Sequence, residues 1–295
     1  MTGANGLQER LLAVIDRGAG ASLSEADFER LALDVFAWQI ERNTLYRAFC
    51  SARGATPASV RSWMEIPAVP TDAFKAAALV CGDPAAAVAV FRTSGTTRGG
   101  DRRGTHYLLD TSLYRASLRA GFRTHLLPDR ASIRMSSLVP SPESLPDSSL
   151  SFMIGDVVEE LGTPESGFHV SGDRLDVDAF VGAVEAAAEQ AEPLLVVGTS
   201  LAFLHLLDEL GSEERALLLP SGSRAMDTGG FKGSSRAVER SELYGRIERS
   251  LGIPATHIVN EYGMTEMSSQ LYDGVAGAAP APGARRHPPG PPRRR

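Results

Sequence analysis

LLVVGTSLAFLHLLDEL, residues 194–210, is the stretch that decides the fold. Leu194–Gly198 is a short apolar run that predicts a buried strand, and apolar residues recur at helical spacing through Ser200–Leu210. A strand that leads directly into a helix is the repeating unit of an α/β protein.

The same alternation continues on both sides of this stretch. The sequence predicts strands at Ser132–Val139, before Asp227 and at Thr256–Asn260, and helices at Val177–Ala191, capped by Asp176, and at roughly Ser235–Leu251. Strands separated by helical patterns of about 10–15 residues favour a mostly parallel sheet covered by helices. In such sheets ligands bind beyond the carboxyl ends of the strands.

The N-terminal part of the chain carries helix signals instead. Ser24 and Asp27 form a predicted capping box, and the apolar residues that follow share one helix face: Phe28, Leu31, Val35 and Trp38. Asp110 is the predicted N-cap of a further helix. Thr71 and Asp72 are predicted to cap a short helix through Leu79.

Composition excludes several classes of protein. With 295 residues, 43% of them hydrophobic and 22% charged, the chain can bury a core and is not disordered throughout. The longest apolar stretch, 194–207, is too short and too polar to span a bilayer, and the N-terminus shows no secretory signal. Cys50 and Cys81 are the only cysteines, which indicates a reducing, cytoplasmic setting.

The net charge of −6 averages two different segments. Residues 274–295 hold five arginines, six prolines and no acid, which predicts a disordered tail after a folded domain at 1–273. Without the tail, 25 basic residues stand against 36 acidic ones. Such an acidic body argues against nucleic acid and membrane surfaces as partners.

Three segments carry candidate chemistry. In FRTSGTTRGG, residues 91–100, hydroxyls and glycines follow a predicted strand at Val88–Phe91, as in a nest for phosphate oxygens, and Arg98, Arg102 and Arg103 could neutralise their charge. The alternative for this segment is an ordinary solvated loop. No Gly-Lys-Ser/Thr sequence ends it, so it is not a Walker P-loop.

The second segment is NEYGMTE, residues 260–266. Tyr262 can stack on a base, Thr265 can donate to a phosphate oxygen, and Glu266 can bind Mg²⁺. The alternative is a turn that leads into a surface helix capped by Thr265. The third segment is DTGGFKG, residues 227–233, whose glycines let the backbone approach a flat ligand, although an ordinary strand-to-helix connection would also use them.

Taken together and in this order, the three segments resemble those of the adenylate-forming (AMP-binding) superfamily. WMEIPAVPTDAFK at 63–75 and GTSLAFLHLLDEL at 198–210 bring the chain close to the LuxE-type acyl-protein synthetases of that superfamily. The resemblance covers about residues 30–273. It implies an α/β large domain with mostly parallel sheets, and ATP and Mg²⁺ as cofactors.

The resemblance also implies roles for individual residues. Ser94, Thr96 and Thr97 would hold the β- and γ-phosphates, and Gly229 and Gly230 would lie against the adenine. Tyr262 would stack on the base, and Thr265, Glu266 and Arg98 would act in catalysis, with Glu266 as the metal ligand. The remaining nucleotide contacts would come from Thr93, Gly95, Glu261 and Gly263.

The implied reaction joins a carboxylic acid, most simply a fatty acid, to AMP and transfers the acyl group to a protein thiol. An acyl-reductase is the implied protein partner. Two alternatives stay open: an aryl- or acyl-CoA ligase of the phenylacetate type, and a non-catalytic nucleotide-binding partner of an acyl-reductase complex. Leu201, Phe203, Leu204 and Leu207 would line the acid pocket if they do not simply face the core, and His205 is read as a core histidine or a substrate contact.

The chain also departs from the superfamily pattern. No ribose-binding aspartate, small C-terminal domain or catalytic lysine follows residue 266, and no acceptor cysteine follows Cys81. We therefore expect a C-terminally truncated enzyme with a nucleotide half-site and weak or no complete turnover.

Overall fold

The computed structural model describes residues 2–18, 22–93, 103–172, 174–212, 217–230 and 238–278. The chain divides into two compact units, where the sequence predicted one large domain. Unit 1 comprises Met1–Ala120, Asp147–Ser149 and Met264–Ser268, and unit 2 comprises Gly121–Pro146, Leu150–Gly263 and Ser269–Arg295.

Unit 2 is built on the predicted parallel sheet. Among the described residues the sheet has six strands in the order β10-β9-β8-β7-β3-β4. The pairs β3–β4, β3–β7, β7–β8 and β8–β9 are all parallel. The strands are β3 (Arg134–Ser137), β4 (Gly167–Phe168), β7 (Leu194–Thr199), β8 (Arg224–Thr228), β9 (Ile258–Met264) and β10 (Ser269–Tyr272).

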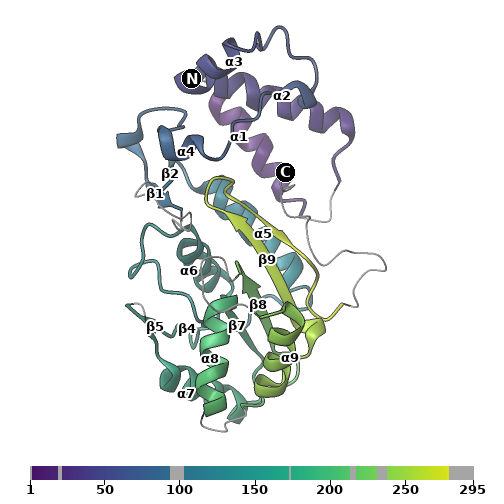
Figure 1. Cartoon of the computed structure of the whole chain (residues 1–295). Coiled ribbons are helices and arrows are strands. Elements are labelled where there is room, and N and C mark those ends of the chain that lie inside the picture. The colour runs from purple at the N-terminus through teal and green to yellow at the C-terminus, as the bar shows by residue number, and fades with distance from the viewer. Residues whose placement is uncertain are drawn as a thin grey trace. The chain divides into compact units, whose positions relative to one another are not determined.

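Helices connect these strands as the alternation predicted. They are α6 (Ser149–Leu161), α7 (Val177–Glu189), α8 (Ser200–Ser212) and α9 (Arg240–Leu251), with a short turn of helix, η3, at Ala255–His257. Helix α5 (Ser112–Leu126) precedes β3, and its residues up to Ala120 belong to unit 1. A two-stranded ribbon, β5 (Val170–Ser171) and β6 (Arg174–Leu175), precedes α7. The helices α7, α8 and α9 lie on the same side of the strands (Figure 1).

One apolar cluster joins those three helices to the sheet. It includes Leu194 and Val196 of β7, Phe180 of α7 and Phe203 of α8, all fully buried. Their neighbours Leu195 and Val197 are also buried and point to the other face of the sheet, because strand side chains alternate. Burial on both faces explains the uninterrupted apolar run that the sequence shows at 194–197.

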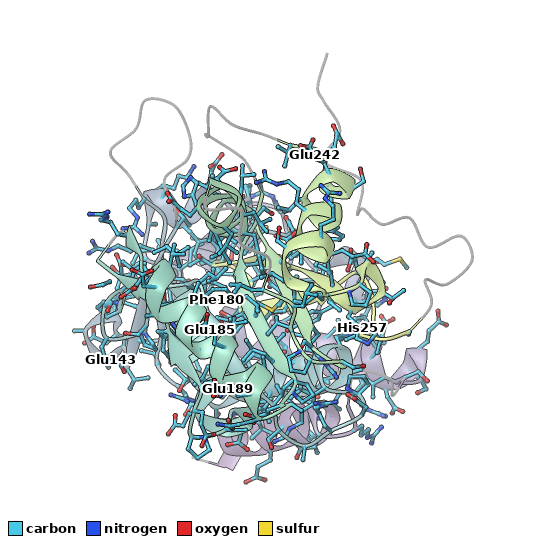
Figure 2. All side chains as sticks on the ribbon, turned by 90° about the horizontal axis from the view of Figure 1, so that it is seen from below. Glu143, Phe180, Glu185, Glu189, Glu242 and His257 are labelled. Atoms are coloured by element: carbon cyan, nitrogen blue, oxygen red, sulfur yellow. The ribbon has the colours of Figure 1, made fainter. Side chains whose placement is uncertain are left out.

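Helix α7 illustrates how the sequence pattern maps onto the fold. Asp176 caps it by accepting a hydrogen bond from the Ala179 N–H at 2.9 Å, as predicted. Phe180 is buried, whereas Glu185 and Glu189 further along the same helix are exposed (Figure 2). Exposed acids opposite an apolar stripe are typical of a helix that covers a sheet.

Unit 1 contains the predicted N-terminal helices. Its helical elements are α1 (Thr2–Ile15), α2 (Glu25–Arg42), α3 (Thr44–Ser51), α4 (Ala73–Ala76) and two 3₁₀ turns, η1 (Trp63–Glu65) and η2 (Pro84–Ala86). Strands β1 (Ala89–Arg92) and β2 (Thr105–Leu108) pair antiparallel. Phe36 of α2, Tyr46 and Cys50 of α3 and Val60 form its buried core.

Ser24 caps α2 as predicted, since its side chain accepts a hydrogen bond from the Asp27 N–H at 3.1 Å. Asp72 makes no cap hydrogen bond, and α4 ends at Ala76, three residues short of the prediction. Phe28 is half exposed and meets Trp63 edge to face, with ring centroids 5.4 Å apart. It therefore contributes less to the core than its position in the apolar pattern suggested.

Three further expectations need correction. His205 is exposed, because the buried positions of α8 fall at Phe203, Leu204, Leu206 and Leu207 and turn the intervening residue outward. Strand β9 continues to Met264 instead of ending at 260. Helix α9 begins at Arg240, and residues 231–237, part of the predicted helix start, lie outside the described residues.

Residues 274–278 are held in unit 2, five residues beyond the predicted start of the tail. The Ala276 N–H donates to the His125 carbonyl at 2.8 Å, and the Gly277 N–H donates to the Thr256 carbonyl at 2.9 Å. The rest of the predicted tail, 279–295, lies outside the described residues. None of the described helices is long and apolar enough to cross a bilayer.

Candidate functional site

Four polar residues lie buried side by side where β8 and β9 approach their carboxyl ends. In the strand register Asp227 is opposite Asn260, and Thr228 is opposite Glu261. All four are less than 10% exposed. Polar side chains at the carboxyl edge of a parallel sheet are expected where a ligand binds.

Asp227 is the centre of a hydrogen-bond network on the side of α8 and α9. Its carboxylate accepts hydrogen bonds from Ser200 Oγ at 2.6 Å, Asn260 Nδ2 at 3.1 Å and Tyr244 OH at 3.4 Å. Burial raises the pKa of the Asp227 carboxyl, while the hydrogen bond from Ser200 and the nearby charge of Arg240 act in the opposite direction. The network fixes the end of β8 against both helices.

The same network extends to the neighbouring strand. Arg240 Nη2 donates to Asn260 Oδ1 at 3.0 Å, and Arg240 Nη1 pairs with Asp273 Oδ2 at 3.4 Å. Asp273 Oδ1 in turn accepts from the Asn260 N–H at 2.8 Å. Asn260, the first residue of the NEYGMTE segment, is thus held from three directions.

Glu261 occupies the other side of the sheet edge. Its Oε2 accepts a hydrogen bond from Thr228 Oγ1, and only 3% of the residue is exposed. Burial raises the pKa of the Glu261 carboxyl to about 7, with a further contribution from the charge of Asp227 and an opposing one from the Thr228 hydrogen bond. The sequence predicted Glu261 as a nucleotide contact; in the structure its carboxyl is turned towards Thr228.

The Gly229–Gly230 turn follows β8, and Tyr262 lies within β9 next to Glu261. Gly229 has φ of +75°, a conformation that favours glycine, and among the described residues a Cβ at Gly229 or Gly230 would meet nothing within 4 Å. Tyr262 is 42% exposed although it follows buried Glu261 in the same strand. An open glycine turn and an accessible aromatic ring are therefore present in unit 2, as base stacking requires.

Thr265 belongs to unit 1 and is held there by two partners. The His106 Nδ1 atom lies 2.7 Å from the Thr265 carbonyl oxygen, and since a carbonyl only accepts, the imidazole nitrogen is the donor. Thr265 Oγ1 and Ser149 Oγ are 3.1 Å apart. Residues 265–268 form a turn before β10, which rules out the alternative in which Thr265 caps a helix.

The predicted phosphate segment is described only at its two ends. The Thr93 N–H donates to the Gly104 carbonyl and the Gly104 N–H donates to Thr93 Oγ1, both at 2.9 Å. Arg103 Nη1 pairs with Asp147 Oδ2 at 3.0 Å, so the charge of Arg103 is already paired within unit 1. The other predicted contacts in the segment, Ser94, Gly95, Thr96, Thr97 and Arg98, lie outside the described residues.

Glu266 is the predicted Mg²⁺ ligand, and it is partly exposed in the turn after β9. No group of three metal-ligating side chains occurs within the part of the chain that the structure describes. Mg²⁺ is commonly held by one or two carboxylates together with the phosphates of its nucleotide, so an accessible carboxylate such as that of Glu266 suits the implied metal.

The predicted acid pocket along α8 is part of the core. Phe203, Leu204 and Leu207 are fully or almost fully buried, and Leu201 is partly buried. The alternative of core packing is thus correct for these residues.

Cys50 is buried and Cys81 partly so, and burial raises the pKa of both thiols, which disfavours the reactive thiolate.

Sequence reasoning missed the network around Asp227 and the partners of Thr265. The sequence signal for this network was the acidic residue Asp227 near the end of a predicted strand, because a buried carboxylate requires hydrogen-bond or charge partners. Nothing near Thr265 in the sequence pointed to His106 or Ser149.

These features define an α/β large domain of the adenylate-forming kind. In a comparison of folds the chain is similar to a 2-hydroxyisobutyryl-CoA ligase, solved in an open conformation with 2-HIB-AMP and CoA. The TM-score is 0.54 at 17% identity, over 80% of this chain and 52% of that ligase, so the chain spans about half the length of the ligase. An amide bond synthetase, Mcba from Marinactinospora thermotolerans, gives a TM-score of only 0.34 at 15% identity, over 51% of this chain and 25% of that one.

The model of the acyl-protein synthetase family LuxE matches residues 22–273. The chain therefore belongs to the LuxE family. None of the curated proteins compared with the chain matches it.

Proposed function

We propose that the protein activates a carboxylic acid as an acyl-adenylate, with ATP and Mg²⁺ as cofactors. The observation that carries the proposal is the carboxyl edge of β8 and β9, where the Gly229–Gly230 turn and exposed Tyr262 follow a buried polar pair in register. Membership of the LuxE family supports the same reaction.

In the proposed first step a carboxylate oxygen of the acid attacks the α-phosphorus of ATP, and the bond to the bridging oxygen breaks to release pyrophosphate. The nucleophile is already ionised at neutral pH, so no general base is required. Within unit 1 the Thr265 hydroxyl lies beside Ser149 Oγ, and His106 holds the Thr265 carbonyl, so we propose that this hydroxyl donates to an α-phosphate oxygen. Mg²⁺, bound by Glu266 and the phosphates, would neutralise charge between the two anions.

In the proposed second step the sulfur of a protein thiol attacks the acyl carbonyl carbon, AMP leaves, and the thiol proton passes to solvent. We propose a fatty acid as the substrate and an acyl-reductase as the protein partner, on the basis of family membership.

ATP–pyrophosphate exchange with a panel of fatty and aryl acids tests the first step. We expect weak, acid-dependent exchange in the protein and its loss in the Glu266→Ala variant; robust exchange would overturn the expectation of weak turnover. Glu189→Ala, which removes an exposed glutamate from α7, is the matched control and should keep wild-type exchange. Formation of acyl-CoA from free CoA without acyl-protein would favour the CoA ligase alternative.

Calorimetry separates the enzyme from a scaffold. Binding of ATP·Mg²⁺ that weakens in Tyr262→Ala but not in Phe28→Leu, a comparably exposed aromatic of unit 1, is the expected outcome. Absence of ATP binding to the wild-type protein at millimolar concentration would contradict the proposed function.

A further inference from the structure

Glu261 touches both segments that are proposed to enclose the adenine. On one side its Oε2 accepts the hydrogen bond from Thr228, the residue that immediately precedes the Gly229 turn. On the other side its Oε1 lies against Gly263, where an added Cβ would come within 2.6 Å of that oxygen. The carboxyl therefore bridges the end of β8 and the residue after Tyr262.

The strand register makes this bridge possible. Thr228 and Glu261 are directly opposite each other in the parallel pair of β8 and β9, so their side chains leave the sheet on the same face. Both residues are at least 95% buried. In a buried site a hydroxyl-to-carboxyl hydrogen bond is exchanged with water rarely, and removal of either partner leaves the other unpaired.

Glu261 differs in this respect from the carboxyl beside it. Asp227 accepts hydrogen bonds from Ser200, Asn260 and Tyr244, and so holds β8 against α8 and α9. Glu261 makes its contacts within the edge itself, with Thr228 before the Gly229–Gly230 turn and with Gly263 in β9. Its side chain is thus suited to setting the distance between that turn and β9 and not to touching the ligand.

We propose that Glu261 is a positioning residue for the adenine, which acts by fixing the Gly229–Gly230 turn relative to Tyr262 through Thr228. This inference rests on the proposed nucleotide function. It requires only an acceptor of the right shape at residue 261 and a hydroxyl donor at residue 228. The negative charge of Glu261 is not required.

The test measures the dissociation constant of ATP·Mg²⁺ by calorimetry in the full-length protein, with the melting curve of each variant recorded alongside. Glu261→Ala and Thr228→Val should each weaken ATP binding about tenfold, and the double variant no further, because either change breaks the same hydrogen bond. Glu261→Gln and Thr228→Ser keep acceptor and donor and should bind within about threefold of wild type.

A merely structural role predicts a different pattern. Losses in melting temperature would then occur without a change in the affinity of the folded protein. A folded Glu261→Ala protein that binds ATP like wild type, or a Gln variant as weak as the Ala variant, would overturn the inference. If Glu261→Ala does not fold, Thr228→Val and Thr228→Ser decide it.

Failure of this inference is distinguishable from failure of the proposed function. A wild-type protein that does not bind ATP overturns the proposed function, and the inference with it. Wild-type binding together with unaffected Glu261→Ala and Thr228→Val variants overturns the positioning role alone.

Discussion

Replacement of Glu261 by glutamine should stabilise the protein at neutral and alkaline pH. Burial raises the pKa of this carboxyl from 4.5 to about 7 in the folded protein. The folded state therefore holds its proton more tightly than the unfolded chain does. Between these two pKa values unfolding releases a proton, so the free energy of unfolding falls as the pH rises through that window.

The magnitude follows from the size of the shift. A displacement of roughly 2.5 pKa units at 1.36 kcal/mol per unit corresponds to a loss of about 3 kcal/mol between pH 4.5 and pH 7, with no further loss above it. Glutamine has nearly the same shape, keeps an acceptor for the Thr228 hydroxyl and does not ionise. It should remove this part of the pH dependence.

Urea unfolding from pH 4.5 to pH 8 of wild type and Glu261→Gln measures the difference. We expect the variant to gain up to about 3 kcal/mol relative to wild type as the pH rises, and the gain to level off above pH 7. Glu189→Gln, an exposed glutamate of the same unit, should follow wild type throughout. Parallel curves for wild type and Glu261→Gln across the window would refute the reasoning.

Three other changes test separate parts of unit 2. Gly229→Ala should cost about 1–2 kcal/mol in urea unfolding because the residue has φ of +75°, whereas Gly230→Ala, at an equally open position without that conformation, should stay within about 0.5 kcal/mol of wild type. Asp227→Ala should cost about 3–5 kcal/mol and sharply lower the melting temperature, since it leaves the buried Ser200 and Tyr244 hydroxyls without this acceptor; a small shift would contradict the network. Arg224 donates a hydrogen bond to Asp129 and holds the pKa of that carboxyl well below its usual value. The stability from this pair is therefore present above the ordinary pKa of 3.8 and is lost as the pH falls. Arg224→Met should reduce this loss of stability at acid pH in circular dichroism titrations, and an unchanged loss would exclude the pair as its source.

The sheet was predictable because its signal is physical and local. A strand buried on both faces must be apolar at every position, as residues 194–197 are, and the helices between strands carry the 3.6-residue pattern of a single buried face. The helix caps Asp176 and Ser24 could also be predicted from the sequence, because each accepts a hydrogen bond from an N–H group only a few residues away.

The contacts within the candidate site could not be predicted from its sequence segments. The Thr228–Glu261 hydrogen bond joins residues 33 positions apart, and the contact of His106 with Thr265 spans 159 positions. Their pairing depends on strand register and tertiary packing, which short sequence windows do not contain. The burial of Glu261 could not be predicted for the same reason, because a carboxylate is expected at the surface unless its buried partner is known.

Met264–Ser268 belongs to unit 1 although most of that unit lies at the N-terminal end of the sequence. This has a consequence for folding during synthesis. Chains generally fold from the N-terminus as they leave the ribosome, one complete unit after another. The His106 imidazole and the Ser149 hydroxyl cannot make their contacts with Thr265 until that residue is synthesised, after nearly all of unit 2. A nascent chain that stops before residue 264 has both units unfinished, so neither unit can complete its packing until the residues from 264 onward have been made.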